Sequence, residues 1–299
     1  MTKENIQFNP TDDLVILLDK VFKNVFNPTR SKKIRHVFEN SAQTVKTVVT
    51  FETLKGVLGE FDKLIFCAAL SEQLAGNKFF TLRRLWQKIG GGHTLTAAMK
   101  KTVSDSVERL ACTRVTIDAS EVNAKNHYNN NEKVIFRNYL LPCKSVELEI
   151  NGQIFEGTYQ FLDTSPLLEV AELKKQFTKQ PFELLNIPKL HNSELVMKLK
   201  FFLLERLAAI IGSHKKHKAH IAGKSEGGKP IYKRAKQLQK IITFESIFEQ
   251  CELKDADNGK KRDVRNVIKK ILNHFKDKNL ITEWTFEKKN GEYYSIHFE

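Results

Sequence analysis

The chain has little of what marks a disulfide-stabilised, metal-binding or membrane protein. Its 299 residues include only four cysteines, and no two of them have the spacing of metal ligands. The most hydrophobic stretch, residues 195–211, is interrupted by four charged side chains, so it predicts a buried helix and not a membrane span. The N-terminus lacks the apolar run of a signal peptide. We therefore expect a cytoplasmic chain without a metal and without membrane contact.

Motifs for catalysis and nucleotide binding are also missing from the sequence. Residues 223–225 imitate the end of a phosphate-binding loop, but a lysine stands where the first glycine should be, and no apolar strand precedes it. Three histidines, His214, His217 and His220, alternate with lysines and lack the usual ligand spacings. We find no carboxylate cluster and no nucleophile constellation. The sequence therefore predicts no catalytic residue, no metal and no cofactor, and we do not expect an enzyme.

What the chain has in excess is positive charge. It contains 49 lysine and arginine residues against 35 acidic ones, a formal charge of +14, so polyanions are its natural partners. The charge is uneven. Residues 213–299 hold 20 basic and 12 acidic residues, a net of +8, while the other 212 residues have a net of +6. The last third of the chain is thus the segment most suited to a nucleic acid.

The pattern of residues 192–299 predicts an apolar helix, a lysine-rich spacer, a short strand, a short helix, a basic amphipathic helix and a β-hairpin. In the basic helix, residues 259–279, apolar side chains recur at the spacing of a buried side: Val264, Val267, Ile268, Ile271, Leu272 and Phe275. Its cations are expected on one exposed side: Lys260, Lys261, Arg262, Arg265, Lys269 and Lys270. This order is typical of a winged helix, whose third helix enters the major groove of double-stranded DNA.

Two further basic segments accompany this helix. The hairpin turns at residues 288–291, where Lys288 and Lys289 point to the DNA backbone if the hairpin is a wing; the alternative is an ordinary charged turn. The spacer, residues 213–239, has eight basic residues and one acid. We favour a basic arm that orders on DNA over a solvated loop. Its candidate DNA contacts are Lys215, Lys216, Lys218, Lys233 and Arg234.

Residues 51–188 repeat the same order of elements. A helix follows Val57, a short strand lies at residues 79–80, Thr81 caps a second helix, and glycines at 90–92 end it. A third helix leads into a predicted hairpin of residues 114–118 and 134–141. Another hairpin, residues 146–161, turns at Asn151-Gly152 and is expected to extend the same sheet.

The third helix of this front domain has little net charge. Lys100 and Lys101 are followed by Asp105 and Glu108 on the side predicted to face solvent. A helix with that face attracts phosphate weakly. We therefore expect residues 51–188 to serve dimerisation or secondary DNA contacts, while residues 189–299, with their basic insertion at 213–239, bind DNA directly.

Residues 1–50 predict a helical extension followed by a connector. Thr11 and two acids are typical of a helix start, and Leu14, Leu17, Val21 and Val25 form an apolar stripe that ends before a polar, basic stretch. The stripe must dock on the body of the protein, which we favour, or on a partner. The predicted fold is therefore α+β, with two tandem winged-helix domains and an N-terminal helical extension.

Several segments resemble a known family when taken in order. They are FDKLIFCAALSEQL, FFTLRRLWQKIGG, LTAAMKKTVSDSVERLACTRVTID and LKKQFTKQPFELLNIPKLHNSELVMKLKFFLLERL. They resemble the tandem winged-helix replication initiators of plasmids and phages, which bind repeated origin sites. The likeness covers roughly residues 55–299 and is most specific from Phe177 to Leu207. It implies that the C-terminal domain makes the main origin contacts and that the N-terminal one serves dimerisation or secondary contacts.

These observations favour a sequence-specific replication initiator, associated with a plasmid or nucleoid, that opens origin DNA and recruits a host initiator and helicase. A homodimer is compatible with this hypothesis. The main alternative is a transcriptional regulator with the same two domains. A nicking initiator is a weaker alternative, because Tyr232 lies beside basic residues but without the histidine pair that such enzymes need.

Overall fold

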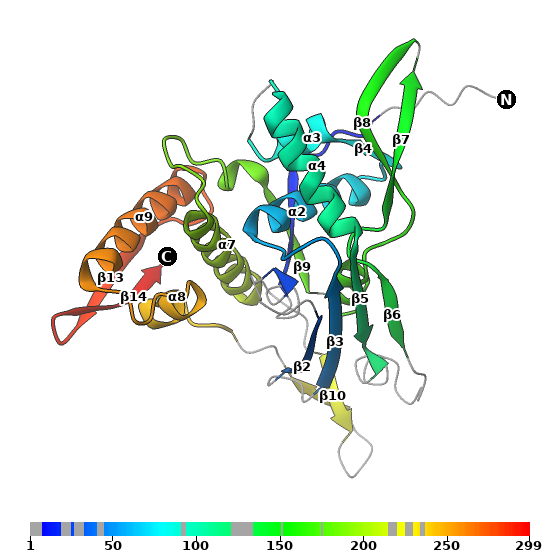
Figure 1. The fold of residues 1–299 in the computed structure, drawn as a ribbon. Coiled ribbons are helices and arrows are strands. Elements are labelled where there is room, and N and C mark those ends of the chain that lie inside the picture. The colour runs from blue at the N-terminus through cyan, green and yellow to red at the C-terminus, as the bar shows by residue number, and fades with distance from the viewer. Residues whose placement is uncertain are drawn as a thin grey trace. The chain divides into compact units, whose positions relative to one another are not determined.

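The computed structural model describes residues 8–18, 25–26, 33–40, 45–90, 94–120, 134–150, 152–174, 176–214, 220–224, 230–233 and 237–299. The chain divides into two units, Met1–Asn186 (unit 1) and Ile187–Glu299 (unit 2). Both combine helices with small antiparallel sheets, which confirms the α+β class (Figure 1). None of the helices that the structure describes is long and apolar enough to cross a membrane.

Unit 1 begins with a strand where a helix was predicted. β1 (Asp13–Leu17) pairs antiparallel with β9 (Phe177–Pro181), so the predicted N-terminal helix is wrong over these residues. Residues 19–24 of the predicted helix lie outside the described residues. The four residues 14–17 are all buried, and a short, continuously apolar run of this kind is compatible with a strand or a helix by its periodicity alone. The partner strand lies more than 150 positions away in the sequence. Local spacing therefore could not identify it.

The predicted basic connector is also a different structure. Residues 33–53 contain β2 (Lys33–Asn40) and β3 (Val45–Thr53), which pair antiparallel. β3 also pairs with β5 (Thr113–Asp118), and β5 pairs with β6 (Ile135–Tyr139). The result is a four-stranded sheet in the order β2-β3-β5-β6. The prediction of a connector is wrong because charged residues alternate along a strand as readily as they occupy a loop.

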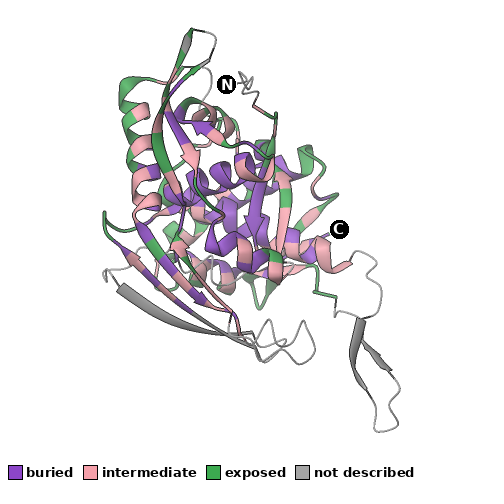
Figure 2. Cartoon of the chain, turned by 90° about the vertical axis from the view of Figure 1, so that its right-hand side faces the viewer, coloured by how far each residue is buried: buried purple, intermediate pink, exposed green. Residues whose placement is uncertain are grey.

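The helices of the front domain are where the sequence predicted them. They are α2 (Glu60–Leu74), α3 (Leu82–Lys88) and α4 (Ala97–Ala111), with the strand β4 (Phe79–Thr81) between the first two. The Thr81 hydroxyl accepts a hydrogen bond from the backbone N–H of Arg84 and caps α3. Twelve of the fifteen residues of α2 are buried, which makes it the central helix of this unit. Figure 2 shows the buried residues gathered on helices and on the strand faces that meet them.

The short strand β4 joins a different hairpin from the one predicted. β7 (Cys143–Ile150) and β8 (Gln153–Phe161) form the hairpin expected around Asn151-Gly152, and β4 pairs with β8 to give the order β4-β8-β7. The β5–β6 hairpin, which the sequence assigned to β4, belongs to the four-stranded sheet instead. Two helical segments follow in the chain: α6 (Pro166–Leu173) and the 3₁₀ turn η1 (Phe182–Leu184).

Buried carboxylates hold the helices of unit 1 together. Glu72 of α2 is 0% exposed, and its carboxylate contacts Arg84 at 2.9 Å and Lys88 at 3.2 Å, both on α3. Asp62, near the start of α2, contacts Arg109 of α4 at 2.7 Å. Because each carboxylate joins α2 to a different helix, the pair of contacts sets the positions of α3 and α4.

Unit 2 follows the predicted order of elements. It contains α7 (Glu194–His214), β10 (His220–Lys224), β11 (Pro230–Lys233), β12 (Ile241–Thr243), α8 (Phe244–Gln250), α9 (Asn258–Asp277), β13 (Trp284–Lys289) and β14 (Glu292–Phe298). The last strands form a sheet in the order β12-β14-β13. Part of the predicted basic spacer is a two-stranded hairpin, in which β10 and β11 pair antiparallel.

The two units share one plan. Each has a short strand that ends in a threonine, Thr81 or Thr243, and that threonine caps the helix that follows. Each short strand pairs with the second strand of a hairpin, in the orders β4-β8-β7 and β12-β14-β13. Unit 1 differs by the insertion of β5 and β6 between its third helix and this hairpin. The repetition predicted from the sequence is therefore present, but in unit 1 the hairpin that pairs with the short strand is β7–β8 and not β5–β6.

Burial of one lysine in α7 yields a testable prediction for unit 2. Lys200 is 2% exposed, its ammonium donates to Asn192 Oδ1 at 2.6 Å, and burial lowers its pKa from 10.5 to about 8. The charged form is therefore disfavoured in the folded protein. Below pH 8 the folded protein is destabilised by the full cost of burying the charged lysine. This cost disappears as the pH rises toward 10.5, because the buried lysine loses its proton before the exposed lysine of the unfolded chain does. We expect Lys200→Met to raise the free energy of unfolding of unit 2 at pH 7 by roughly 2 kcal/mol.

The chain offers a direct way to measure this change. It has two tryptophans, and Trp284 lies in unit 2 while Trp86 lies in unit 1. Urea unfolding of a Trp86→Phe protein, followed by Trp284 fluorescence at pH 7 and pH 10, reports unit 2. Stability should rise with pH in the parent and not in Lys200→Met, whereas Lys254→Met, at an exposed position, should leave the rise intact. An equal rise in the Lys200→Met protein would contradict the assignment.

Candidate nucleic-acid interface

The basic helix α9 is amphipathic in the way that the sequence indicated. Asp257 caps it, with its carboxylate accepting from the backbone N–H of Lys260 at 2.8 Å. That hydrogen bond holds the pKa of the Asp257 carboxyl below its usual value. The buried side consists of Val264, Ile268, Ile271, Leu272 and Phe275, while Val267 is only half-buried. The opposite side of the helix is left for a partner.

The six candidate cations of α9 do not share one side. A helix turns about 100° per residue, so Lys261, Arg262, Arg265 and Lys269 fall within an arc of about 100°, and Lys260 and Lys270 lie outside it. Placing all six on one side was therefore wrong. Lys260, Arg262, Lys269 and Lys270 are exposed, and Lys261 and Arg265 are half-buried. The cationic flank of α9, as we call it, comprises Lys261, Arg262, Arg265 and Lys269.

Aromatic rings of unit 2 lie beneath three cations of this flank. The Lys261 ammonium is 5.7 Å from the ring centre of Phe248, and the Lys269 ammonium is 5.7 Å from that of Phe286. The Arg265 guanidinium carbon is 4.9 Å from the centre of the Tyr293 ring. Such contacts orient a cation without neutralising it. The rings were not identified from the sequence, although their alternation with charged residues in β13 and β14 was visible.

The hairpin β13–β14 carries the remaining exposed cations of this face. Asn290 and Gly291 both have positive φ, 54° and 82°, as a tight hairpin turn requires, which confirms the predicted turn. Lys288 lies 4.7 Å from the centre of the Tyr293 ring, and Lys289 lies 5.4 Å from that of Tyr294. Figure 1 shows this hairpin beside α9. The helix and the hairpin therefore present cations from adjacent elements.

Two contacts fix the hairpin to the far end of α9. The indole N–H of Trp284 donates to Asn273 Oδ1 at 3.2 Å, and Lys276 forms an ion pair with Glu283. The ring centres of Trp284 and Phe286 are 5.0 Å apart. Trp284 is half-buried, with Asn273 as its polar partner. The hairpin is thus tied to α9 along its length.

One candidate base-reading residue was missed. Asn266 is exposed near the middle of the outer side of α9, between Arg262 and Lys269. An asparagine amide can bond adenine at two atoms, and arginine does the same with guanine. Asn266 carries no charge, so a search for cations passes over it. Asn266 stands four positions after Arg262 and three before Lys269, and this helical spacing is the signal that could have identified it.

Four of the five candidate DNA contacts of the basic spacer lie outside the described residues. They are Lys215, Lys216, Lys218 and Arg234. The backbone of Lys233 is described, and it pairs with His220 in the β10–β11 hairpin. Contact of this segment with DNA stays a prediction.

On the corresponding face of unit 1, Lys55 and Lys100 are paired with acids, while Lys101 is exposed without an ion pair among the residues that the structure describes. Lys100 of α4 contacts Glu156 of β8 at 2.5 Å, and Lys55 contacts Glu108 at 2.7 Å. The hydrogen bond from Lys100 holds the pKa of the Glu156 carboxyl below its usual value. Lys55, Lys100 and Glu108 line an open groove of about 760 Å³ between α4 and the β7–β8 hairpin. The near-neutral charge expected for this face therefore takes the form of specific ion pairs.

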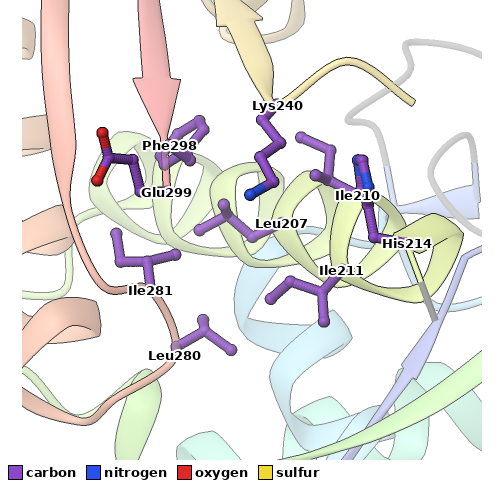
Figure 3. A pocket seen from close by; sticks show the side chains of 9 residues that line it. All are labelled: Leu207, Ile210, Ile211, His214, Lys240, Leu280, Ile281, Phe298 and Glu299. Carbon is purple, nitrogen blue, oxygen red and sulfur yellow. The ribbon is translucent and has the colours of Figure 1, made fainter. Parts of the chain in front are cut away.

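A second hollow, in unit 2, is apolar. It has a volume of about 260 Å³, and its lining includes Leu207, Ile210, Ile281 and Phe298 (Figure 3). The Lys240 side chain extends toward Leu207, and the imidazole of His214 lies at the opposite edge, with Nε2 2.8 Å from the carbonyl oxygen of Leu238. No residue of α9 or β13 lines this hollow. It is therefore separate from the cationic face.

Comparison with known proteins identifies a fold. No protein-family model matches the chain, and no curated protein matches it. The chain is similar to two crystal structures of domains 2 and 3 of RctB, each with a TM-score of 0.50 and covering 93% of this chain and 95% of that chain. The sequence identities are 12% for the selenomethionine derivative and 10% for the other structure. At this identity the likeness shows a shared two-domain fold.

Proposed function

We propose that the chain is a sequence-specific, double-stranded DNA-binding replication initiator built from two winged-helix units. It recognises repeated origin sites on a plasmid or phage-like element, promotes opening of the adjacent DNA and recruits host replication proteins. The observation that carries this proposal is the continuous cationic face of α9 and the β13–β14 hairpin. The shared fold with RctB domains 2 and 3 and the resemblance in sequence to replication initiators support it.

In this proposal α9 is the recognition helix and β13–β14 is the wing. A helix of this kind lies in the major groove, which is wide enough to admit it, while the wing reaches the neighbouring backbone. Arg262 and Asn266 point outward for base edges, and Lys288 and Lys289 meet phosphates. Unit 1, where Lys55 and Lys100 form ion pairs with acids, serves dimerisation or secondary contacts.

The proposed mechanism is non-covalent. Binding energy at several sites bends or opens DNA, with no bond made or broken by the protein. The competing nicking mechanism requires Tyr232 as the nucleophile. A transcriptional regulator, the other alternative, needs the same interface but has no effect on replication.

Footprinting of the full chain on the DNA upstream of its own gene tests the proposal. We expect protection of directly repeated sites spaced by about two helical turns, because two winged helices reach about that far along a duplex. A plasmid that carries these sites and depends on the protein in trans should replicate. Absence of protection on any duplex contradicts the proposal. Protection without replication favours the regulator, and a nicked plasmid with protein attached favours the nicking initiator.

A further inference from the structure

One position of the hairpin reaches back to the third helix in both units. In unit 2 it is Tyr293 of β14, two residues before the residue that pairs with the capping threonine Thr243. In unit 1 it is Glu156 of β8, two residues before the residue that pairs with Thr81. Both positions lie at a β-bulge of the hairpin, where Tyr293 pairs with Lys288 and Glu156 lies within the bulge of its strand. Counted from the partner of the capping threonine, Tyr293 and Glu156 hold corresponding positions in the shared plan.

The two residues hold cations by different means. The Glu156 carboxylate contacts the Lys100 ammonium at 2.5 Å, and an ion pair of this kind neutralises the lysine. The Tyr293 ring contacts two cations, the guanidinium carbon of Arg265 at 4.9 Å and the ammonium of Lys288 at 4.7 Å. A ring attracts cations through its quadrupole and has no net charge, so both keep their positive charge.

The location of the Tyr293 ring makes this contact relevant to DNA. Its exposed fraction is 37%, so it lies at the surface, between the flank of α9 and the turn of the hairpin. Arginine and lysine lose much rotamer freedom when they are fixed on a ligand. A contact that restricts them before binding lowers that loss and improves affinity.

We propose that Tyr293 is a positioning residue of the DNA interface. Its ring holds Arg265 of the helix and Lys288 of the wing, so that both meet phosphates of the same duplex. This inference rests on the proposed function and adds to it the residue that makes helix and wing act together. The presence of glutamate at the equivalent position of unit 1 explains why that face has less charge to offer.

Substitution of Tyr293 in the full chain tests the inference. Binding to a random-sequence duplex of about 30 base pairs is followed by fluorescence anisotropy between about 50 and 200 mM KCl, the range over which phosphate contacts change affinity most. Tyr293→Phe keeps the ring and should bind within about twofold of the parent. Tyr293→Glu imitates unit 1. It should bind at least about 10-fold more weakly and flatten the salt slope by roughly 0.9 for each phosphate that the protein no longer binds.

A matched control and a double-mutant cycle separate positioning from stability. Tyr139→Leu removes a ring that contacts Arg114 at 5.7 Å in unit 1, and it should leave the salt slope unchanged. Tyr293→Leu should weaken binding in the parent but not in a protein that already carries Arg265→Ala and Lys288→Ala. A purely structural ring would weaken binding in both.

The outcomes distinguish this inference from the function on which it rests. If the parent binds no duplex, both are overturned. If the parent binds and Tyr293→Glu and Tyr293→Leu bind with the same affinity and salt slope, only the inference is overturned. If Tyr293→Glu does not fold, as judged by circular dichroism, the Phe and Leu variants and the cycle decide the question.

Discussion

Replacing Arg262, Arg265 and Lys269 together by alanine is expected to abolish selective binding to the origin sites. These residues lie three and four positions apart on the cationic flank of α9, beside the buried side that contains Val264 and Ile268. Loss of a base-reading or phosphate-binding cation costs about 1–3 kcal/mol, so the triple variant should bind its site at least about 100-fold more weakly. The measurement is a titration of the footprinted duplex and of a scrambled duplex of equal length.

The control for this variant removes the same charge elsewhere. Arg114, Lys144 and Lys179 are exposed cations of unit 1, and their replacement by alanine changes the net charge equally. This control should bind within a few-fold of the parent. If the cationic-flank variant folds and keeps both its affinity and its preference for the origin duplex, α9 is not the recognition helix.

The single substitutions should differ among themselves. Arg262 is exposed and has no aromatic ring beneath it among the contacts that the structure describes, so Arg262→Ala should relax selectivity at one base pair. Arg265 is half-buried against Tyr293, so Arg265→Ala should weaken binding to all sequences alike and reduce the salt slope. The same slope for both variants would contradict this division of roles.

Glu72→Gln is expected to destabilise unit 1 by about 3–5 kcal/mol, because it removes one partner of a buried ion pair and leaves two cations without their counter-charge. Glu72 is completely buried, and its carboxylate contacts Arg84, Lys88 and the Asn77 amide, the last at 2.6 Å. Urea unfolding of a Trp284→Phe protein, followed by Trp86 fluorescence, reports the change because Trp86 lies on the same helix as Arg84.

An exposed ion pair of the same unit provides the comparison. Glu156→Gln breaks the contact with Lys100 at the surface, where water and salt screen the charges, and it should leave the unfolding midpoint nearly unchanged. Equal midpoints for Glu72→Gln and Glu156→Gln would show that burial does not set the strength of these pairs. A loss confined to Glu72→Gln supports the role of Glu72 in fixing α3.

The helices were predictable from the sequence because their signals are local. Thr81 and Thr243 stand directly before apolar periodic segments, and both cap the helices that the sequence placed there. The apolar spacing of α9 identified five of its buried residues between Val264 and Phe275, although Val267 is half-buried and the buried His274 was not predicted. Caps and periodicity act within one or two turns, so neighbouring residues suffice to reveal them.

The partners of strands were not predictable in the same way. The order of β4, β5–β6 and β7–β8 along the chain is compatible with β4 joining either hairpin, and the sequence assigned the nearer one. The N-terminal run Leu14–Leu17 was predicted as a helix, and its partner strand, β9, could not be recognised because it lies far along the chain. Strand pairing depends on the burial of residues that are distant in the sequence. A strand forms hydrogen bonds with the strand that packing of the whole core places beside it.

The sequence alone identified the three main helices of each unit, most of the buried side of α9, the hairpins that turn near Gly152 and at Asn290-Gly291, and the concentration of positive charge in the last third. Only the tertiary structure decided which hairpin completes each three-stranded sheet, and which cations pair with acids and which lie on aromatic rings. The physical reason is distance along the chain. Propensity, caps and turns are properties of neighbouring residues, whereas the charge that the third helix presents depends on whether Glu156 or Tyr293 meets it across a folded hairpin.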